Sequence, residues 1–151
     1  MLSTGQGCVV PASQTKRNML MRRVGSMMIL RENQNDPFEF EWDEFLGFLT
    51  KNSEDLVNIR MLVRTDGGVA NAGQRKRLAA ALGKNNPLVA VVSDAMKVRF
   101  AGATIALFQA NYRQYTVKEL PQAFVHLGLD TDQRRIAHAT LRELEEELYA
   151  K

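Results

Sequence analysis

Cysteine and histidine are scarce in this chain: among 151 residues it has one cysteine, Cys8, and two histidines, His126 and His138. A single cysteine excludes an intramolecular disulfide, and neither histidine has a metal-ligand spacing, so we expect no metal site and no bound cofactor. Long hydrophobic runs are missing too. The longest, Leu88–Val92, is far too short to cross a bilayer, so we expect no integral membrane segment and a cytoplasmic location.

The chain also lacks a catalytic constellation. Neither G-x-x-x-x-G-K-[ST] nor G-x-G-x-x-G occurs, and no G-x-S-x-G elbow surrounds Ser93. Asp66 and Asp94 are expected at the ends of neighbouring strands, where they could form a carboxylate pair, but no further group for acid–base catalysis accompanies them. We therefore predict that the protein is not an enzyme.

The charges that are present are unevenly distributed, although the net charge is only +3. Seven acidic residues and one basic residue lie between Asp36 and Asp55, whereas eight basic and two acidic residues lie between Val57 and Arg99. This asymmetry suggests an anionic ligand or complementary self-association, or else solvated faces that differ by chance. No aromatic and basic binding surface is apparent, so nucleic acid is not an expected partner.

The order of apolar patterns predicts one α/β domain with a small, mostly parallel mixed sheet, because strand-like and helix-like segments alternate. We expect a flexible tail over residues 1–18, a domain over 19–129, and an extra helix over 130–151 packed on or extending it. Residues 19–30 are predicted as one long strand or a hairpin turning at Gly25-Ser26. The other predicted strands are 57–65, 88–92 and 112–115, and the other predicted helices are 72–82, 97–109, a segment ending at Gly128 and 130–149.

An acidic helix is expected to follow the first strands. Asp36 is its predicted cap, with Pro37 in the first turn. Its apolar face comprises Phe38, Trp42, Phe45, Leu46 and Leu49, which follow helical spacing. Phe40 falls on the opposite face, among Glu39, Glu41, Asp43 and Glu44, so we expect it to be exposed. With Phe48 on the flank, Phe40 is a candidate partner surface.

The most informative segment is the turn between the predicted strand 57–65 and the predicted helix 72–82. This segment contains glycines, a capped helix start and a cluster of basic residues. Asn71 and Gln74 form a capping box, and the free N–H groups of a helix start attract anions. The strand ends of an open α/β sheet commonly hold the ligand or partner site. The predicted binding residues here are Asp66, Gly67, Gly68, Asn71, Gln74, Arg75, Arg77, Ser93 and Asp94.

The predicted C-terminal helix has charges that oppose its dipole: Arg134 and Arg135 lie near its start and Glu145–Glu147 near its end. Either packing tolerates this arrangement, or the acidic end meets a basic surface, such as that of a second copy.

The order of these elements resembles STAS-like domains, the fold class of bacterial anti-sigma-factor antagonists, over residues 19–129. The resemblance implies helices packed mainly on one face of a mixed sheet, and a regulatory function through protein–protein contact. In those antagonists a serine or threonine at a helix start is the phosphorylation switch, but no hydroxyl lies between Asp66 and the helix here. The matching segments are Thr65-Asp66-Gly67-Gly68, Asn71-Ala72-Gly73-Gln74-Arg75, Val89-Ala90-Val91-Val92-Ser93, Val98-Arg99 and Leu127-Gly128-Leu129.

Two functions follow as hypotheses. The first is a regulatory or scaffolding interaction module that uses the 66–77 turn. The second is a domain that binds a small anionic or lipid-like ligand at the same strand ends. A flat, charged surface exposing Phe40 and Phe48 would favour the first, and a deep pocket lined by methionine and aromatic side chains beside Arg75 would favour the second.

Overall fold

The protein folds around a five-stranded mixed sheet, as the sequence predicts. The computed structural model describes residues 16–106 and 111–150, and over residues 102–106 it describes the backbone alone. Cys8 and most of the expected N-terminal tail therefore lie outside the described residues. The strands lie side by side in chain order, and only β1 runs antiparallel to its neighbour. They are β1 (Met19–Val24), β2 (Met27–Glu32), β3 (Arg60–Thr65), β4 (Leu88–Val92) and β5 (Tyr112–Tyr115).

Of the two forms open for residues 19–30, the structure has the hairpin. Gly25 occupies the turn between β1 and β2 with a φ of 59°, a left-handed conformation that glycine adopts without steric cost. The pairing of Val24 with Met27 closes the hairpin tightly.

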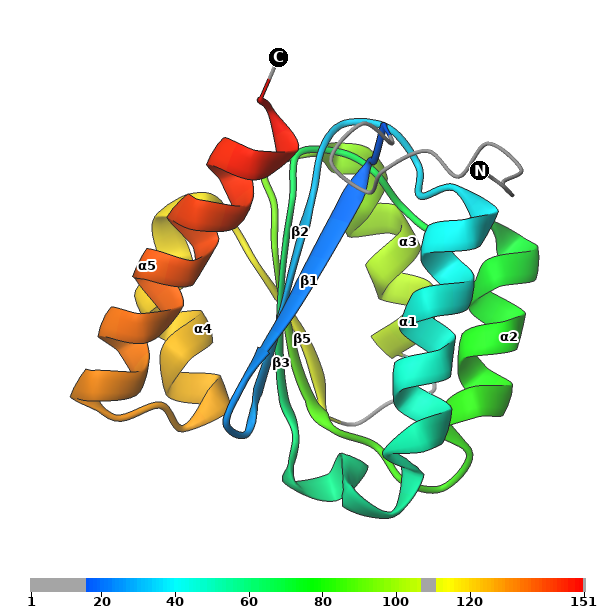
Figure 1. The fold of residues 1–151 in the computed structure, drawn as a ribbon, viewed down its shortest axis with the longest axis horizontal. Helices are drawn as coiled ribbons and strands as arrows, with labels where there is room; N and C mark the ends of the chain where they lie inside the picture. The colour runs from blue at the N-terminus through cyan, green and yellow to red at the C-terminus, as the bar shows by residue number, and fades with distance from the viewer. Residues whose placement is uncertain (1–15, 107–110, 151) are drawn as a thin grey trace, which may run out of the picture.

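Helices cover both faces of the sheet (Figure 1). Three crossover helices, α1 (Glu39–Lys51), α2 (Ala72–Leu82) and α3 (Met96–Ala106), lie together on one face. They share a face because right-handed crossovers between strands added in one direction always pass over the same side. The short α4 (Leu120–Leu127) and the long α5 (Thr131–Leu148) cover the other face, whereas the resemblance implied helices mainly on one face.

Alternation along the strands divides the core into two layers. On β2, Met28 and Leu30 face α1–α3, whereas Met27 and Ile29 face α4 and α5. The α4–α5 layer is tightly packed: its side chains on β2 and β4 include Ile29 and Val92, both fully buried.

The start of α1 differs from the prediction, because Phe38 rather than Asp36 is its N-cap. Asp36 instead accepts a hydrogen bond from the backbone N–H of Val69 at 3.1 Å and forms an ion pair with Lys97 at 2.9 Å. Phe38 is 40% exposed rather than part of the buried face of α1. Trp42, like the other predicted members of that face, is buried.

Glu41 was expected on the exposed face of α1 but is completely buried. Its carboxylate accepts hydrogen bonds from the backbone N–H groups of Asn18, Met19 and Phe38, at 2.7–2.8 Å. Three donors explain why this acid lies inside: it joins the start of β1 to the start of α1 and satisfies backbone groups that would otherwise be buried without partners.

The remaining predicted elements are close to the observed ones. Helix α2 and strands β4 and β5 have the predicted bounds. Strand β3 begins at Arg60 rather than Val57, because residues Ser53–Asn58 form the 3-10 helix η2. A second 3-10 helix, η3 (Val117–Glu119), precedes α4, and Gly128 is the C-cap of α4 with a φ of 67°.

The acidic end of α5 meets a basic surface, and that surface belongs to the sheet of the same chain. Arg22 on β1 pairs with Glu143 and Glu147, and Arg31 on β2 pairs with Glu145 at 2.6 Å. These contacts hold the C-terminal helix against β1 and β2.

Candidate functional site

The glycines of the predicted site allow two loops to pack closely together. Gly67 has a φ of 147°, and a Cβ on Gly68 would lie only 2.2 Å from the backbone oxygen of Asn35. The N–H of Gly68 donates to the oxygen of Asn33 at 2.9 Å. Glycine is therefore needed here for the contact between the β3–α2 turn and the β2–α1 loop, whether or not a ligand binds.

The capping box predicted at the start of α2 is present. Asn71 Oδ1 accepts from the N–H of Gln74 at 2.8 Å, and Gln74 Oε1 accepts from the N–H of Asn71 at 2.9 Å. The side-chain nitrogen of buried Gln74 donates to the oxygen of Pro37 and to Glu39 Oε1. These side chains thus join α2 to the start of α1.

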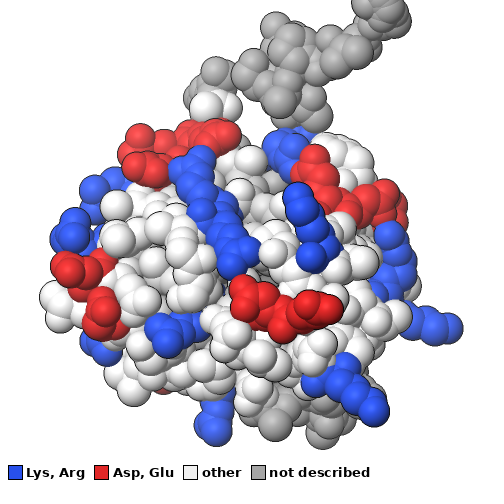
Figure 2. Space-filling view, turned by 60° about the horizontal axis from the view of Figure 1, so that its bottom comes forward, with Lys and Arg blue, Asp and Glu red and all other residues white. Residues whose placement is uncertain are grey.

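The basic cluster after the turn is split between two environments. Arg77 forms ion pairs on the surface with Glu39 at 3.1 Å and Asp43 at 2.5 Å, both on α1. Arg75 turns inward and donates to the backbone oxygen of Ala70 at 2.6 Å. Part of the charge asymmetry in the sequence is therefore neutralised between neighbouring helices, and acidic and basic side chains lie interleaved on the face shown in Figure 2.

Asp66 and Asp94, the expected carboxylate pair, bind separate partners. Asp66 is held by Arg31, Arg64 and the hydroxyl of Tyr149. Burial alone would raise the pKa of Asp66, but the hydrogen bonds from Tyr149 and Arg31 and the two arginine charges lower it below its ordinary value. Asp94 Oδ1 accepts from the N–H of Val117 at 2.9 Å.

Ser93 and the two phenylalanines of the proposed partner surface lie in different surroundings. Ser93 is buried, and its hydroxyl oxygen accepts from the N–H of Ala95 at 3.1 Å. Phe40 is 40% exposed and stacks on Phe38 with ring centroids 5.7 Å apart. Phe48 is half-buried, with the guanidinium of Arg23 lying over its ring.

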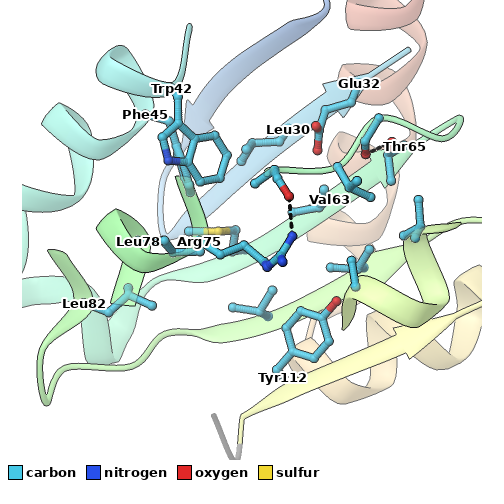
Figure 3. A pocket seen from close by; sticks show the side chains of 18 of the residues that line it. Leu30, Glu32, Trp42, Phe45, Val63, Thr65, Arg75, Leu78, Leu82 and Tyr112 are labelled. Carbon is cyan, nitrogen blue, oxygen red and sulfur yellow. Dashed lines mark hydrogen bonds between the residues drawn. The ribbon is translucent and has the colours of Figure 1, made fainter. Parts of the chain in front are cut away.

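A cavity of about 110 Å³ lies between the sheet and α1–α3, and its wall is mostly apolar (Figure 3). Trp42 and Phe45 from α1, Met61 from β3 and Tyr112 from β5 contribute the larger side chains of the wall. The turn residues Gly68, Val69 and Ala70 line it as well, so the cavity begins at the predicted turn and continues between the layers.

Val63 marks the position of the cavity in the fold. It lies in the middle of β3, the central strand, and its side chain faces the α1–α3 layer, yet it is only half-buried. On the opposite face of the same strand, Leu62 is 1% exposed. The α1–α3 layer therefore leaves space over the centre of the sheet that the α4–α5 layer does not.

Three polar side chains point into this space from different sides: Glu32 from the end of β2, Arg75 from α2 and Tyr112 from β5 (Figure 3). Thr65 also lines it, but its hydroxyl donates to the oxygen of Gly68 at 2.9 Å. The Tyr112 hydroxyl oxygen accepts a hydrogen bond from the side chain of Gln114 at 3.2 Å.

Glu32 is the least satisfied polar side chain of the cavity. It is 7% exposed, and its Oε1 is the only buried side-chain nitrogen or oxygen in the described part of the chain that has no hydrogen-bond partner. Burial, as the largest cause, and the charges of Glu41 and Asp36 together raise the pKa of Glu32 to about 8, against the opposing charge of Arg31. At neutral pH the carboxyl group is therefore mostly protonated and uncharged.

Sequence reasoning missed Glu32, Trp42 and Tyr112 as site residues. A signal for Glu32 was present, because period-two alternation places it on the same face of β2 as Met28 and Leu30. An acidic residue in register with an apolar face is buried at a free-energy cost and is thus a candidate for function. For Trp42 and Tyr112 the sequence indicates that the side chains are buried, but it does not indicate that a cavity lies next to them.

The comparisons with family models, curated proteins and solved structures found no match to this chain. In the described parts of the chain, none of the helices is both long and apolar enough to cross a lipid bilayer. Nor do three or more possible metal ligands come together among those residues. What defines the protein is an α/β domain with an apolar cavity on one side of its sheet and a buried acid in the cavity wall.

Proposed function

We propose that this domain binds a small, mostly apolar molecule in the cavity between the sheet and α1–α3. The observation that carries the proposal is the unpartnered, buried carboxyl oxygen of Glu32 in an otherwise apolar wall. Ligand sites are typically concave and apolar, with a few polar groups that fix the orientation of the ligand. Met61 and aromatic side chains line this cavity beside Arg75, and a pocket of that kind favours the ligand-binding hypothesis over the interaction module.

The size of the cavity indicates the size of the ligand. An engineered apolar cavity of about 150 Å³ in another protein takes up benzene, and the cavity here is about 110 Å³ and partly open to the surface. The enclosed part of the ligand is therefore about the size of one ring or a short branched chain. Any longer tail would extend out of the cavity.

Benzyl alcohol is a suitable neutral probe, and Trp42, the single tryptophan, is a built-in reporter because it lines the cavity. Titration should give a saturable change in Trp42 fluorescence. Val63→Phe adds carbon atoms inside the cavity and should weaken binding at least tenfold. Leu78→Phe tests the same point from α2, in case the first variant fails to fold.

Val125→Phe is the matched control, because Val125 lies on α4 and is 65% exposed. This variant should bind the probe as the wild type does. Equal binding by the wild type and by both folded cavity variants, or an unsaturable fluorescence change, would refute the ligand-binding proposal.

An interaction module of STAS-like type is our second proposal. It is supported by the stack of Phe38 and Phe40, both 40% exposed near the N-terminus of α1. Two aromatic side chains together on a surface favour contact with another protein, including a second copy. Sedimentation velocity tests self-association: Phe40→Ser should shift any oligomer toward monomer, and an unchanged oligomer distribution would count against this surface.

A further inference from the structure

We propose that the ligand of this cavity carries a protonated amine that binds Glu32. This inference rests on the proposed function and specifies the chemistry of the same site. Glu32 Oε1 is a buried acceptor without a donor among the described residues, and an ammonium group is a compact donor with three N–H bonds. A ligand amine would therefore satisfy the one buried side-chain oxygen or nitrogen that lacks a partner in the part of the chain that the structure describes.

The charges around Glu32 favour a cation over an anion. Glu41 from α1 and Asp36 from the β2–α1 loop both impose negative potential on it. Burial raises the pKa of Tyr112 on β5, and the Glu32 charge adds to this effect, so the two groups lie near each other. Arg31 is the nearby positive charge on β2. Its guanidinium, however, lies on the α5 side of the sheet.

Arg31 does not neutralise the carboxyl group of Glu32, because its guanidinium makes its hydrogen bonds to other groups. The guanidinium donates to Asp66 at 2.9 Å and to Glu145 at 2.6 Å, and it also donates to the backbone oxygen of Glu32 rather than to its carboxyl group. A second cation, supplied by the ligand, would pair with the ionised form of Glu32.

Arg75 is the other charged side chain of the cavity wall. Its guanidinium donates to the backbone oxygen of Ala70 at 2.6 Å. The amine end of the ligand is thus assigned to the Glu32 end of the cavity. An anionic ligand held by Arg75 is the competing outcome that the experiment must distinguish.

Binding should release a proton. Before binding at neutral pH, Glu32 is mostly the neutral acid, since burial raises its pKa to about 8. In the complex the carboxylate faces the ammonium group, so the carboxyl proton passes to the buffer and the amine keeps its own. Opposite charges in contact favour the ionised forms of both groups, so nearly one proton is released per ligand at pH 7.

Benzylamine, benzyl alcohol and benzoate test the inference, because they present an ammonium, a hydroxyl and a carboxylate on the same ring. Binding is followed by Trp42 fluorescence and by titration calorimetry in buffers of different ionisation enthalpy. In the wild type at pH 7, benzylamine should bind about tenfold more tightly than benzyl alcohol, since charge-assisted hydrogen bonds are markedly stronger than neutral ones. Only benzylamine should release a proton.

Glu32→Gln should reduce the benzylamine-to-benzyl alcohol affinity ratio to about one and abolish the proton release. Glu54→Gln, at an exposed acid on η2, is the matched control and should leave the ratio and the proton release as in the wild type. A ratio near one in the wild type, an unchanged ratio in Glu32→Gln, or tightest binding of benzoate would overturn the inference. Saturable benzyl alcohol binding in those cases would leave the ligand-binding proposal standing, whereas its absence would refute both.

Discussion

Replacing Glu32 by glutamine should change how the stability of the domain depends on pH. The pKa of this carboxyl group is raised from 4.5 to about 8 by burial. Between these values the unfolded chain releases the proton and the folded chain keeps it, so stability falls as pH rises. At about 1.4 kcal/mol per pH unit, the wild type should lose about 4 kcal/mol between pH 5 and pH 8.

Other acidic groups do not obscure this window. The pKa values of Asp36 and Asp66 are lowered from 3.8 and that of Glu119 from 4.5. Carboxyl groups with lowered pKa values contribute stability that is present above their unfolded values and is lost only as pH falls through the folded ones. Their contribution is therefore nearly constant above pH 5, and the difference between the wild type and Glu32→Gln from pH 5 to pH 8 reports Glu32.

Urea denaturation at unit intervals from pH 5 to pH 9 measures the effect. Glu32→Gln keeps the shape of the neutral acid but cannot ionise, so the variant should match the wild type near pH 5 and exceed its free energy of unfolding at pH 8. Glu54→Gln removes a charge from an exposed site and should follow the wild-type profile. Parallel profiles for the wild type and Glu32→Gln would refute the assignment of a buried, neutral Glu32.

Four other substitutions test the contacts around the site by thermal and urea unfolding. Gly68→Ala should destabilise the domain by about 3 kcal/mol or leave it unfolded, because the added Cβ would lie 2.2 Å from the backbone oxygen of Asn35. Gly73→Ala is the control: its Cβ makes ordinary contacts in the first turn of α2, so the substitution should be neutral or stabilising by about 0.5 kcal/mol. Equal effects of the two substitutions would contradict the need for glycine at position 68. Glu41→Gln should cost about 2 kcal/mol, since an amide has one acceptor oxygen for three backbone donors; a neutral result would show that these bonds are unimportant. Arg31→Gln should cost about 3 kcal/mol by leaving carboxylates on α5 and beside β3 without their shared partner, and an unchanged midpoint would refute the role of that network.

Local signals in the sequence predicted much of the fold. Helix α2 has the predicted bounds because its capping box at Asn71 and its terminal Gly83 are local signals that need no tertiary information. Strand β4 was predicted because an apolar run between turn residues has few alternatives in an α/β chain. The predicted start of β3 was wrong because Val57 continues the alternation of Ile59 and Met61 in the sequence, although it belongs to η2 in the structure.

The candidate site was less accessible to sequence reasoning, because it depends on contacts between distant segments. Asp66 follows its strand as expected, but its partners Arg31 and Tyr149 come from β2 and the C-terminus. The sequence predicted Arg75 as a site residue, and its side chain lines the cavity together with Leu78. It could not show that helices on one face would leave a cavity there, since the fit of packed layers depends on the combined shapes of many side chains.

The cavity should also be visible in the stability of the protein without any ligand. An unfilled cavity of about 110 Å³ lowers the free energy of unfolding by about 3 kcal/mol, at about 24 cal/mol per Å³ of cavity volume. Val63 and Val92 allow the same one-carbon addition on opposite faces of the sheet, one half-buried at the cavity and the other fully buried against the α4–α5 layer.

Val63→Ile should stabilise the domain by about 0.8 kcal/mol, because the added carbon fills empty space next to apolar side chains. Val92→Ile should destabilise it by about 1–3 kcal/mol, because the same carbon enters a layer that is already full. Urea denaturation compares the two variants directly. If Val63→Ile is as damaging as Val92→Ile, the space over β3 is filled in solution, and the cavity is not available to a ligand. If it is stabilising, the wild-type valine leaves unfilled a space that a larger residue could occupy, as expected where function rather than stability determines the residue.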